Sequence, residues 1–146
     1  MKMAKEKNIG TDTKKADKEC NDNNCPFHGS LRCRGRIFVG TVTGTKMHKT
    51  ATVEWARRNY LQKYERYEKR RTRLKAHNPP CISAQDGDIV KIMECRPLSK
   101  TKNFVIIEKF GKEKGFKEKV EALEESKFKK AEKEEEKAEE NESPKS

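Results

Sequence analysis

The sequence lacks the features that would place it in a membrane or in a secretory pathway. Hydrophobic residues make up only 32% of the 146 residues. No window approaches the roughly 18–20 consecutive apolar residues that a membrane-spanning helix needs. The opening residues, MKMAKEKNIGTD, lack the apolar run of a signal peptide. We therefore expect a cytoplasmic protein with no membrane partner.

Signals of catalysis are also scarce. The glycines are scattered and open no helix, so the sequence contains no glycine-rich phosphate loop. His48 and His77 lie in expected turns beside cations, and neither has a carboxylate or thiol at a spacing that would pair a base with a nucleophile. We therefore predict a protein that is not an enzyme and that has no small-molecule substrate.

Cysteine occurs five times, an odd number that argues against a disulfide framework in a chain without an export signal. The candidate zinc ligands, which lie within fourteen residues, are Cys20, Cys25, His28 and Cys33. Their spacing is irregular for zinc, so it favours reduced, partly buried thiols, with structural zinc as the alternative. Cys81 and Cys95 are expected in or near the core. We therefore assign no cofactor.

Positive charge is what the chain has in excess. It contains 35 Lys and Arg against 24 Asp and Glu, a formal net charge of +11. After residue 111, ten lysines and twelve glutamates nearly balance, so the excess belongs to the preceding part. An anionic partner would relieve the resulting self-repulsion, and nucleic acid is the leading candidate.

The distribution of residue types divides the chain into three parts. Residues 1–30 are polar and predict an extended arm, and residues 112–146 predict a Lys/Glu-rich tail that is largely disordered or partly helical. Between 31 and 111, β-branched and aromatic residues gather in short runs separated by turn residues. The expected strands cover 34–46, 50–58, 68–76, 89–95 and 103–110. Five short strands without crossover helices predict a small all-β barrel or sandwich.

The stretch 59–77 is the ambiguous part of this pattern. Tyr60, Tyr64 and Tyr67 recur at spacings of three and four residues, which suits a helix. A cation-rich strand fits equally well. We favour a loop followed by a strand over 68–76, because a small barrel needs its third strand here.

Strict alternation predicts which side chains point inward. Ala51, Val53 and Trp55 alternate with polar residues and should face the core, and Phe38 should also be internal. Gly40, in the middle of the first run, suits a strongly coiled strand at a barrel corner.

Cations gather in three places, at 46–49, 57–75 and 96–102. The middle cluster interleaves tyrosines with Lys and Arg, a mixture that can bind RNA phosphates and stack on exposed bases. In the last cluster, Pro97 stiffens the exit from a strand, and Arg96 can bind a phosphate through two parallel hydrogen bonds. A solvated charged face is the alternative for any single cluster. Three clusters together with the overall surplus favour nucleic-acid binding.

Several motifs closely resemble one family, the small-subunit ribosomal proteins numbered seventeen, in their archaeal version. The matching stretches are CPFHG (25–29), RGRIFVGTV (34–42), KYERYEKRRTRLKAHNPPC (63–81) and GDIVKIMECRPLSKTKNF (87–104). The resemblance covers about residues 8–110, and the strand that ends in Arg-Pro-Leu-Ser is the family's signature. The tail after residue 111 departs from the family's usual form.

The resemblance implies a five-stranded barrel of the oligonucleotide-binding (OB) type that is a structural constituent of the small ribosomal subunit. It implies direct binding to small-subunit ribosomal RNA, mainly the 5′ domain, with neighbouring ribosomal proteins as further partners. Eukaryotic relatives tend to have threonine in place of His28, so zinc is not implied for the whole family. The alternative function is a free single-strand RNA-binding OB protein of the cold-shock or initiation-factor kind.

Charge clusters and resemblance together define a set of expected RNA contacts. Its members are Lys46, His48, Lys49, Thr50, Arg57, Arg58, Tyr64, Arg66, Tyr67, Lys69, Arg70, Arg71, Arg73, Lys75, His77, Asn78, Arg96, Pro97, Ser99, Lys100, Thr101 and Lys102.

Overall fold

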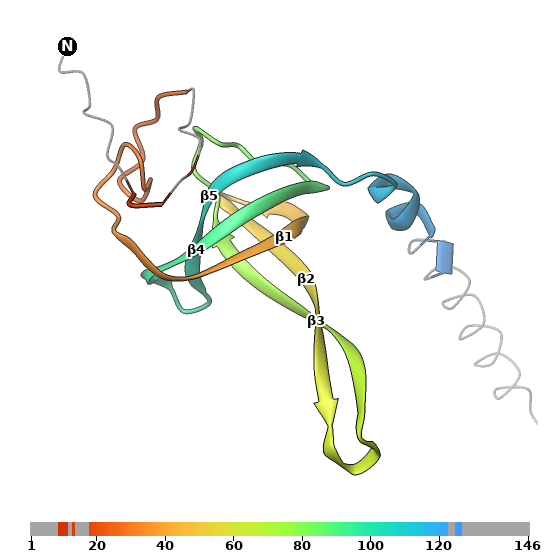
Figure 1. Cartoon of the computed structure of the whole chain (residues 1–146). Coiled ribbons are helices and arrows are strands. Elements are labelled where there is room, and N and C mark those ends of the chain that lie inside the picture. The colour runs from red at the N-terminus through yellow and green to blue at the C-terminus, as the bar shows by residue number, and fades with distance from the viewer. Residues whose placement is uncertain (1–8, 12, 14–17, 123–124, 127–146) are drawn as a thin grey trace, which may run out of the picture. The chain divides into compact units, whose positions relative to one another are not determined.

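Five strands form the body of the protein. The computed structural model describes residues 9–11, 13, 18–122 and 125–126. The strands are β1 (Cys33–Met47), β2 (Thr50–Leu61), β3 (Arg66–His77), β4 (Asp88–Ser99) and β5 (Lys102–Lys112), with a 3-10 turn η1 (Gln62–Tyr64) between β2 and β3. They form a closed barrel in the order β1-β2-β3-β5-β4 (Figure 1). The prediction of an all-β, five-stranded OB-type barrel is confirmed.

One parallel pairing closes the barrel. All other neighbouring strands are antiparallel, but β3 and β5 run in parallel, with Lys75 opposite Lys102 and His77 opposite Val105. Closure leaves no free sheet edge in the barrel wall, so its backbone N–H and C=O groups are protected from pairing with other chains.

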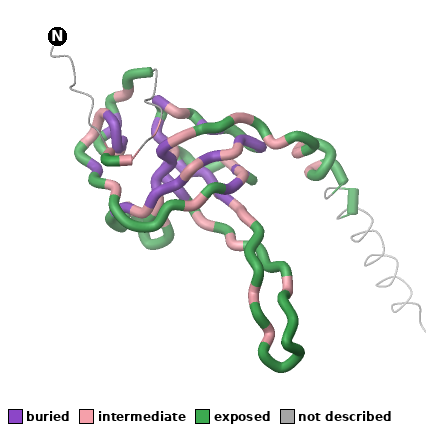
Figure 2. Tube along the Cα trace, in the orientation of Figure 1, coloured by how far each residue is buried: buried purple, intermediate pink, exposed green. Residues whose placement is uncertain are grey.

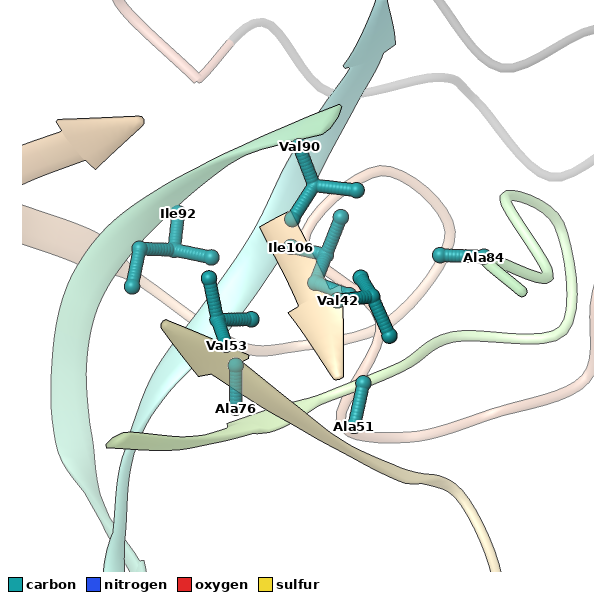
Figure 3. Close-up of a cluster of buried hydrophobic side chains, with 8 residues drawn as sticks. All are labelled: Val42, Ala51, Val53, Ala76, Ala84, Val90, Ile92 and Ile106. Atoms are coloured by element: carbon teal, nitrogen blue, oxygen red, sulfur yellow. The ribbon is translucent and has the colours of Figure 1, made fainter. Parts of the chain in front are cut away.

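The barrel interior is filled by small and branched side chains from every strand. Val42, Val53, Ile92 and Ile106 are all fully buried and point toward one another (Figure 3). Ala51 and Val53 are buried as the alternation predicts, whereas Trp55 is partly buried. Its ring stacks on Phe38 with centroids 4.8 Å apart, at the margin of this cluster.

Strand β4 is covered on both faces, which explains its continuous apolar run. Ile92 points into the barrel, whereas Met93 and Cys95 belong to a second cluster that includes Leu31 from the segment before β1. Because successive side chains of a strand point to opposite faces, burial on both faces requires an outer cover. Leu31, which is 4% exposed, supplies part of that cover.

Gly40 allows β1 to approach β2 closely. A Cβ atom built there would lie 2.8 Å from the carbonyl oxygen of Glu54 and 2.8 Å from Cγ1 of Val53. Any side chain would push the two strands apart. The expectation that this glycine serves a tightly coiled strand is therefore consistent with the packing.

Residues 22–30, which lie within the predicted extended arm, are not extended. Residues 22–30 form a compact turn in which the N–H of Gly29 donates to the carbonyl of Cys25 at 3.0 Å. Cys25 and Phe27 are buried and pack with Cys81 from the loop between β3 and β4. Burying these side chains against the barrel overrides the polar composition that predicted an extended arm.

Two further local expectations need correction. Strand β4 continues through Pro97 to Ser99, so the expected loop 96–102 is reduced to a turn at residues 100 and 101. Pro97 is tolerated because it falls in the gap between the ladder pairs Glu94–Phe104 and Ser99–Lys102, where no regular hydrogen bond is lost. The stretch 59–77 is neither helix nor long loop, because β2 extends to Leu61 and β3 begins at Arg66.

The tail is partly helical within the described residues, over 116–122 and 125–126. The remaining parts of the predicted arm and tail, at 1–8, 12, 14–17, 123–124 and 127–146, lie outside the described residues.

Candidate nucleic-acid interface

A two-stranded ribbon extends from the barrel and carries the middle cation cluster (Figure 1). The register of β2 and β3 continues without a bulge from Thr50 opposite His77 to Leu61 opposite Arg66. Residues 56–58 and 69–71 are exposed, and most of the outer part of the ribbon has no cover (Figure 2). An isolated two-stranded ribbon is only marginally stable in water, so this one is suited to a partner that covers it.

One face of the ribbon collects most of its cations. Directly opposite residues share a face, and positions two apart along a strand point the same way. The register therefore places five cations on one side, which we call the basic face: Arg58, Lys69, Arg71, Arg73 and Lys75.

Glu54 is the acidic residue that pairs with this face. Its Oε2 accepts from Nε of Arg73 at 2.5 Å, and its Oε1 lies 3.6 Å from Nη1 of Arg71. Glu54 is much less exposed than the two arginines, so it restricts their conformations while leaving their remaining N–H groups toward solvent. Such prior ordering lowers the entropy lost on binding.

Like charges lie directly opposite each other in two cross-strand pairs of the ribbon. Arg58 lies opposite Lys69, and on the other face Arg57 lies opposite Arg70. Arg70 is paired with Glu68. Within the part of the chain that the structure describes, Arg57, Arg58 and Lys69 form no ion pair. Directly opposed like charges destabilise a ribbon, and an anionic ligand between them would remove that repulsion.

Tyrosines surround the tip of the ribbon. Tyr60 and Tyr67 are cross-strand neighbours with ring centroids 5.1 Å apart, and Nζ of Lys63 lies 5.5 Å from the ring centroid of Tyr64. Tyr64 and Tyr67 are 64% and 69% exposed. Exposed rings beside cations can stack on unpaired bases while the cations bind phosphate.

The other two cation clusters lie at turns of the barrel. Lys46, His48 and Lys49 are exposed at the β1–β2 turn, where Lys49 adopts a left-handed conformation with φ of 48°. At the β4–β5 turn the exposed residues are Arg96, Pro97, Ser99, Lys100 and Thr101. Nη2 of Arg96 donates to Oδ1 of Asn24 at 3.4 Å, so the segment before β1 holds part of this cluster.

Three residues that the sequence placed among the RNA contacts have hydrogen-bond partners within the protein. His77 is 2% exposed, and Thr50 is 9% exposed and accepts from Nζ of the partly buried Lys102. The side chain of Asn78 bonds to both the N–H and the C=O of Ala84. The turn before β1 covers His77, Lys102 of β5 lies beside Thr50, and Asn78 is bonded to the following loop. The other members of the set, apart from the partly buried Lys102, are exposed and remain the main predicted RNA contacts.

His77 forms a buried pair with Asp22. Nε2 of His77 lies 2.9 Å from Oδ2 of Asp22, and Nζ of Lys49 lies 3.8 Å from Oδ1. Burial lowers the pKa of His77 and outweighs the opposing effect of Asp22. Burial acts to raise the pKa of Asp22, but the N–H of Asn24 together with His77 and Lys49 lowers it overall. The neutral imidazole therefore donates from Nε2 to the carboxylate, and Nδ1 has no partner among the described residues.

The fold separates one of the four candidate metal ligands, Cys33, from the other three. Cys33 lies on β1 opposite Cys95 and packs with Leu31 and Met93, where burial raises the pKa of its thiol to about 12. Cys20, Cys25 and His28 come together instead with Cys81, with all four ligand atoms within 4.8 Å of one another. Cys81 thus occupies the place that sequence spacing gave to Cys33. Sequence reasoning missed it because Cys25 and Cys81 are 56 positions apart in the chain.

The thiols of Cys25 and Cys81 are hydrogen-bonded to each other. Sγ of Cys25 lies 3.6 Å from Sγ of Cys81. The hydrogen bond from Cys81 lowers the pKa of Cys25 to about 4. Burial opposes this shift, whereas the backbone N–H groups of His28 and Phe27 add to it.

The comparisons with known proteins all point to one family. The family model described as Ribosomal protein S17 matches residues 40–108. Small ribosomal subunit protein uS17 of Methanococcus vannielii is 60% identical over 102 residues, covering 70% of this chain and 94% of the relative. The uS17 of Methanocaldococcus jannaschii is 57% identical over 106 residues, covering 73% and 91%. The uS17 of Archaeoglobus fulgidus is 53% identical over 108 residues, covering 73% and 96%.

These similarities agree with the motifs and with the barrel. Among the described residues, no helix is long and apolar enough to cross a membrane. The chain belongs to the S17 family of small-subunit ribosomal proteins, in its archaeal type.

Proposed function

We propose that this protein binds small-subunit ribosomal RNA directly, mainly in the 5′ domain, and that it supports subunit assembly without catalysing a reaction. In this function the barrel is a rigid support for three cationic surfaces. These are the ribbon of β2 and β3, the β1–β2 turn and the β4–β5 turn. Neighbouring ribosomal proteins are further partners within the particle.

The observation that carries the proposal is the uncompensated charge of the ribbon. Arg58 and Lys69 lie opposite each other on the basic face, and neither has an acidic partner in the described structure. Such an arrangement lowers the stability of the free protein and becomes favourable when phosphates lie along the face. Structured RNA presents mainly phosphates, sugar hydroxyls and a shallow groove, so recognition depends chiefly on shape and backbone.

The alternative, a free single-strand RNA-binding protein, would use aromatic side chains exposed on the barrel wall. Here Phe38 and Trp55 stack on each other, and Phe38 also contacts Phe104 with centroids 5.9 Å apart. All three are partly buried and pack against the interior cluster. Phe38, Trp55 and Phe104 therefore do not form the exposed aromatic surface that this alternative requires.

Titration of the full chain with two RNAs tests the proposal. One is a folded transcript of the small-subunit 5′ domain, and the other is an unstructured RNA of similar length and charge. We expect tighter binding to the folded RNA, together with chemical protection of nucleotides beside the ribbon. Equal affinity for both RNAs would support the single-strand alternative, and no protection of the 5′ domain would reject the proposed site.

A further inference from the structure

The strongest feature that RNA binding does not use is the group of three cysteines and one histidine beside the barrel. We propose that Cys20, Cys25, His28 and Cys81 bind a structural Zn²⁺ ion that fastens the segment before β1 to the loop between β3 and β4. The proposal does not depend on RNA binding, and it concerns the isolated protein.

The distances between the ligand atoms match a tetrahedral zinc site. With Zn–S bonds of about 2.3 Å and a Zn–N bond of about 2.05 Å, a tetrahedron requires S···S separations of about 3.8 Å and S···N separations of about 3.6 Å. Nδ1 of His28 lies 3.4 Å from Sγ of Cys20 and 3.6 Å from Sγ of Cys25. Sγ of Cys25 lies 3.6 Å from Sγ of Cys81. All four atoms lie within 4.8 Å of one another, so a single central ion can reach them with small adjustments.

The backbone around the group is arranged as a ligand shell requires. The N–H of Asp22 donates to the sulfur of Cys20, and the N–H groups of Phe27 and His28 donate to the sulfur of Cys25. Hydrogen bonds of this kind orient thiolate ligands and stabilise their negative charge. The turn is tight, since a Cβ at Gly29 would lie 2.4 Å from the carbonyl oxygen of Asn23.

The donor set and its burial indicate a structural site. Three thiolates and one imidazole complete the coordination of zinc and leave no open position for a substrate. Cys25 is 0% and Cys81 is 6% exposed, and Phe27 packs beside them. The described residues contain no second group of this kind.

The position of the group gives the ion a mechanical role. Cys20, Cys25 and His28 lie before β1, whereas Cys81 follows the strand that closes the barrel against β5. Apart from the small apolar cluster, the polar contacts of the turn 22–30 with the barrel include the Asp22–His77 pair and the hydrogen bond between Arg96 and Asn24. A bound ion would join both segments through strong bonds and keep the turn 22–30 against the barrel.

Metal analysis of the full-length protein tests the inference. The protein is prepared with a reductant, loaded with zinc salt and freed of unbound metal before zinc is measured by mass spectrometry. We expect about one zinc per chain in the wild type and less than about a tenth of an equivalent in Cys81→Ser. Cys33→Ser is the matched control, because Cys33 lies opposite Cys95 outside the group, and it should retain about one zinc.

Cobalt substitution checks the geometry. Co²⁺ in the wild type and in Cys33→Ser should give the strong visible bands of a tetrahedral site and thiolate-to-metal charge transfer. If Cys81→Ser fails to fold, Cys20→Ser and His28→Gln serve instead, because both residues are only partly buried. Each should lose tetrahedral coordination while Trp55 fluorescence reports an intact barrel.

Three results would overturn the site. The first is a wild type that holds less than about a tenth of an equivalent of zinc after loading. The second is a Cys20→Ser variant with wild-type zinc content and cobalt spectrum. The third is a Cys25–Cys81 disulfide that persists in the protein prepared with reductant and excludes metal. None of these results bears on ribosomal RNA binding, since no RNA is present.

Discussion

Nε2 of His77, the last residue of β3, lies 2.9 Å from Oδ2 of Asp22 in the turn before β1. This buried pair joins a segment outside the barrel to the strand that closes it. Replacing Asp22 with alanine would leave the buried N–H of His77 without its acceptor. We expect the free energy of unfolding to fall by about 1–3 kcal/mol, measured by urea denaturation. Glu19→Ala, an exposed change in the same segment, should alter stability by less than about 0.5 kcal/mol.

The same pair predicts how stability depends on pH. Burial lowers the pKa of His77 in the folded protein below its ordinary value of 6.5. At a pH between the folded pKa and the unfolded pKa of His77, the unfolded chain binds a proton that the folded chain does not, so acidification favours unfolding. The contribution of His77 is therefore complete above pH 6.5 and is lost progressively below it.

Denaturation measured between pH 7 and pH 5 in the presence of a chelator checks this sign. The free energy of unfolding should fall on acidification, and His77→Gln should show a smaller fall. The chelator removes any contribution from protonation of metal ligands. A wild type whose stability rises on acidification would show that His77 is charged in the folded state.

The like-charge pair of the ribbon predicts opposite effects on binding and on stability. In Arg58→Gln/Lys69→Gln, affinity for the 5′-domain RNA should fall, and the plot of log K against log salt should become shallower by about 1.5–2. The same change removes a direct repulsion, so the free protein should be unchanged or more stable by about 0.2–1 kcal/mol.

The matched control for this variant removes two charges from the tail. Lys114→Gln/Lys117→Gln should leave the salt dependence of RNA binding close to that of the wild type. Equal losses in the two variants would mean that net charge, and not the ribbon, determines affinity.

The core predicts a contrast between two isoleucines. Ile92 is fully buried in the barrel, whereas Ile37 is 39% exposed on β1. Ile92→Ala should cost about 2–5 kcal/mol, because it removes apolar contacts and leaves a cavity. Ile37→Ala should cost about 1 kcal/mol or less, because its side chain is already partly hydrated. Thermal unfolding of the two variants measures the difference, and similar melting temperatures would show that the inner and outer faces were assigned incorrectly.

Two glycines of β1 give a similar comparison. Gly40→Ala would place a methyl group 2.8 Å from the backbone of Glu54, so we expect destabilisation of about 1–3 kcal/mol. At Gly44 a Cβ would meet nothing within 4 Å. Gly44→Ala should therefore be nearly neutral or slightly stabilising. Chemical denaturation of both variants is the measurement, and an equal cost at both sites would contradict the close approach of β1 and β2.

The local pattern of apolar, polar and turn residues was sufficient to predict much of the fold. Alternation at Ala51 and Val53 predicted the inner face of β2, and the turn residues between apolar runs predicted where most strands end. These features depend on neighbouring residues, since side-chain direction in a strand has a period of two. The pattern could not decide between helix and strand for 59–77, because tyrosines and arginines suit both.

The amino-acid sequence by itself determined the number of strands, the excess of positive charge and the family. Only the tertiary structure decided which residues are accessible, burying His77 and Thr50 outside the barrel interior and arranging Arg58 and Lys69 on one face. It also brought Cys81 to Cys20, Cys25 and His28. The physical reason is that closing the barrel joins β3 to β5 and brings distant loops together, an arrangement that no local periodicity encodes.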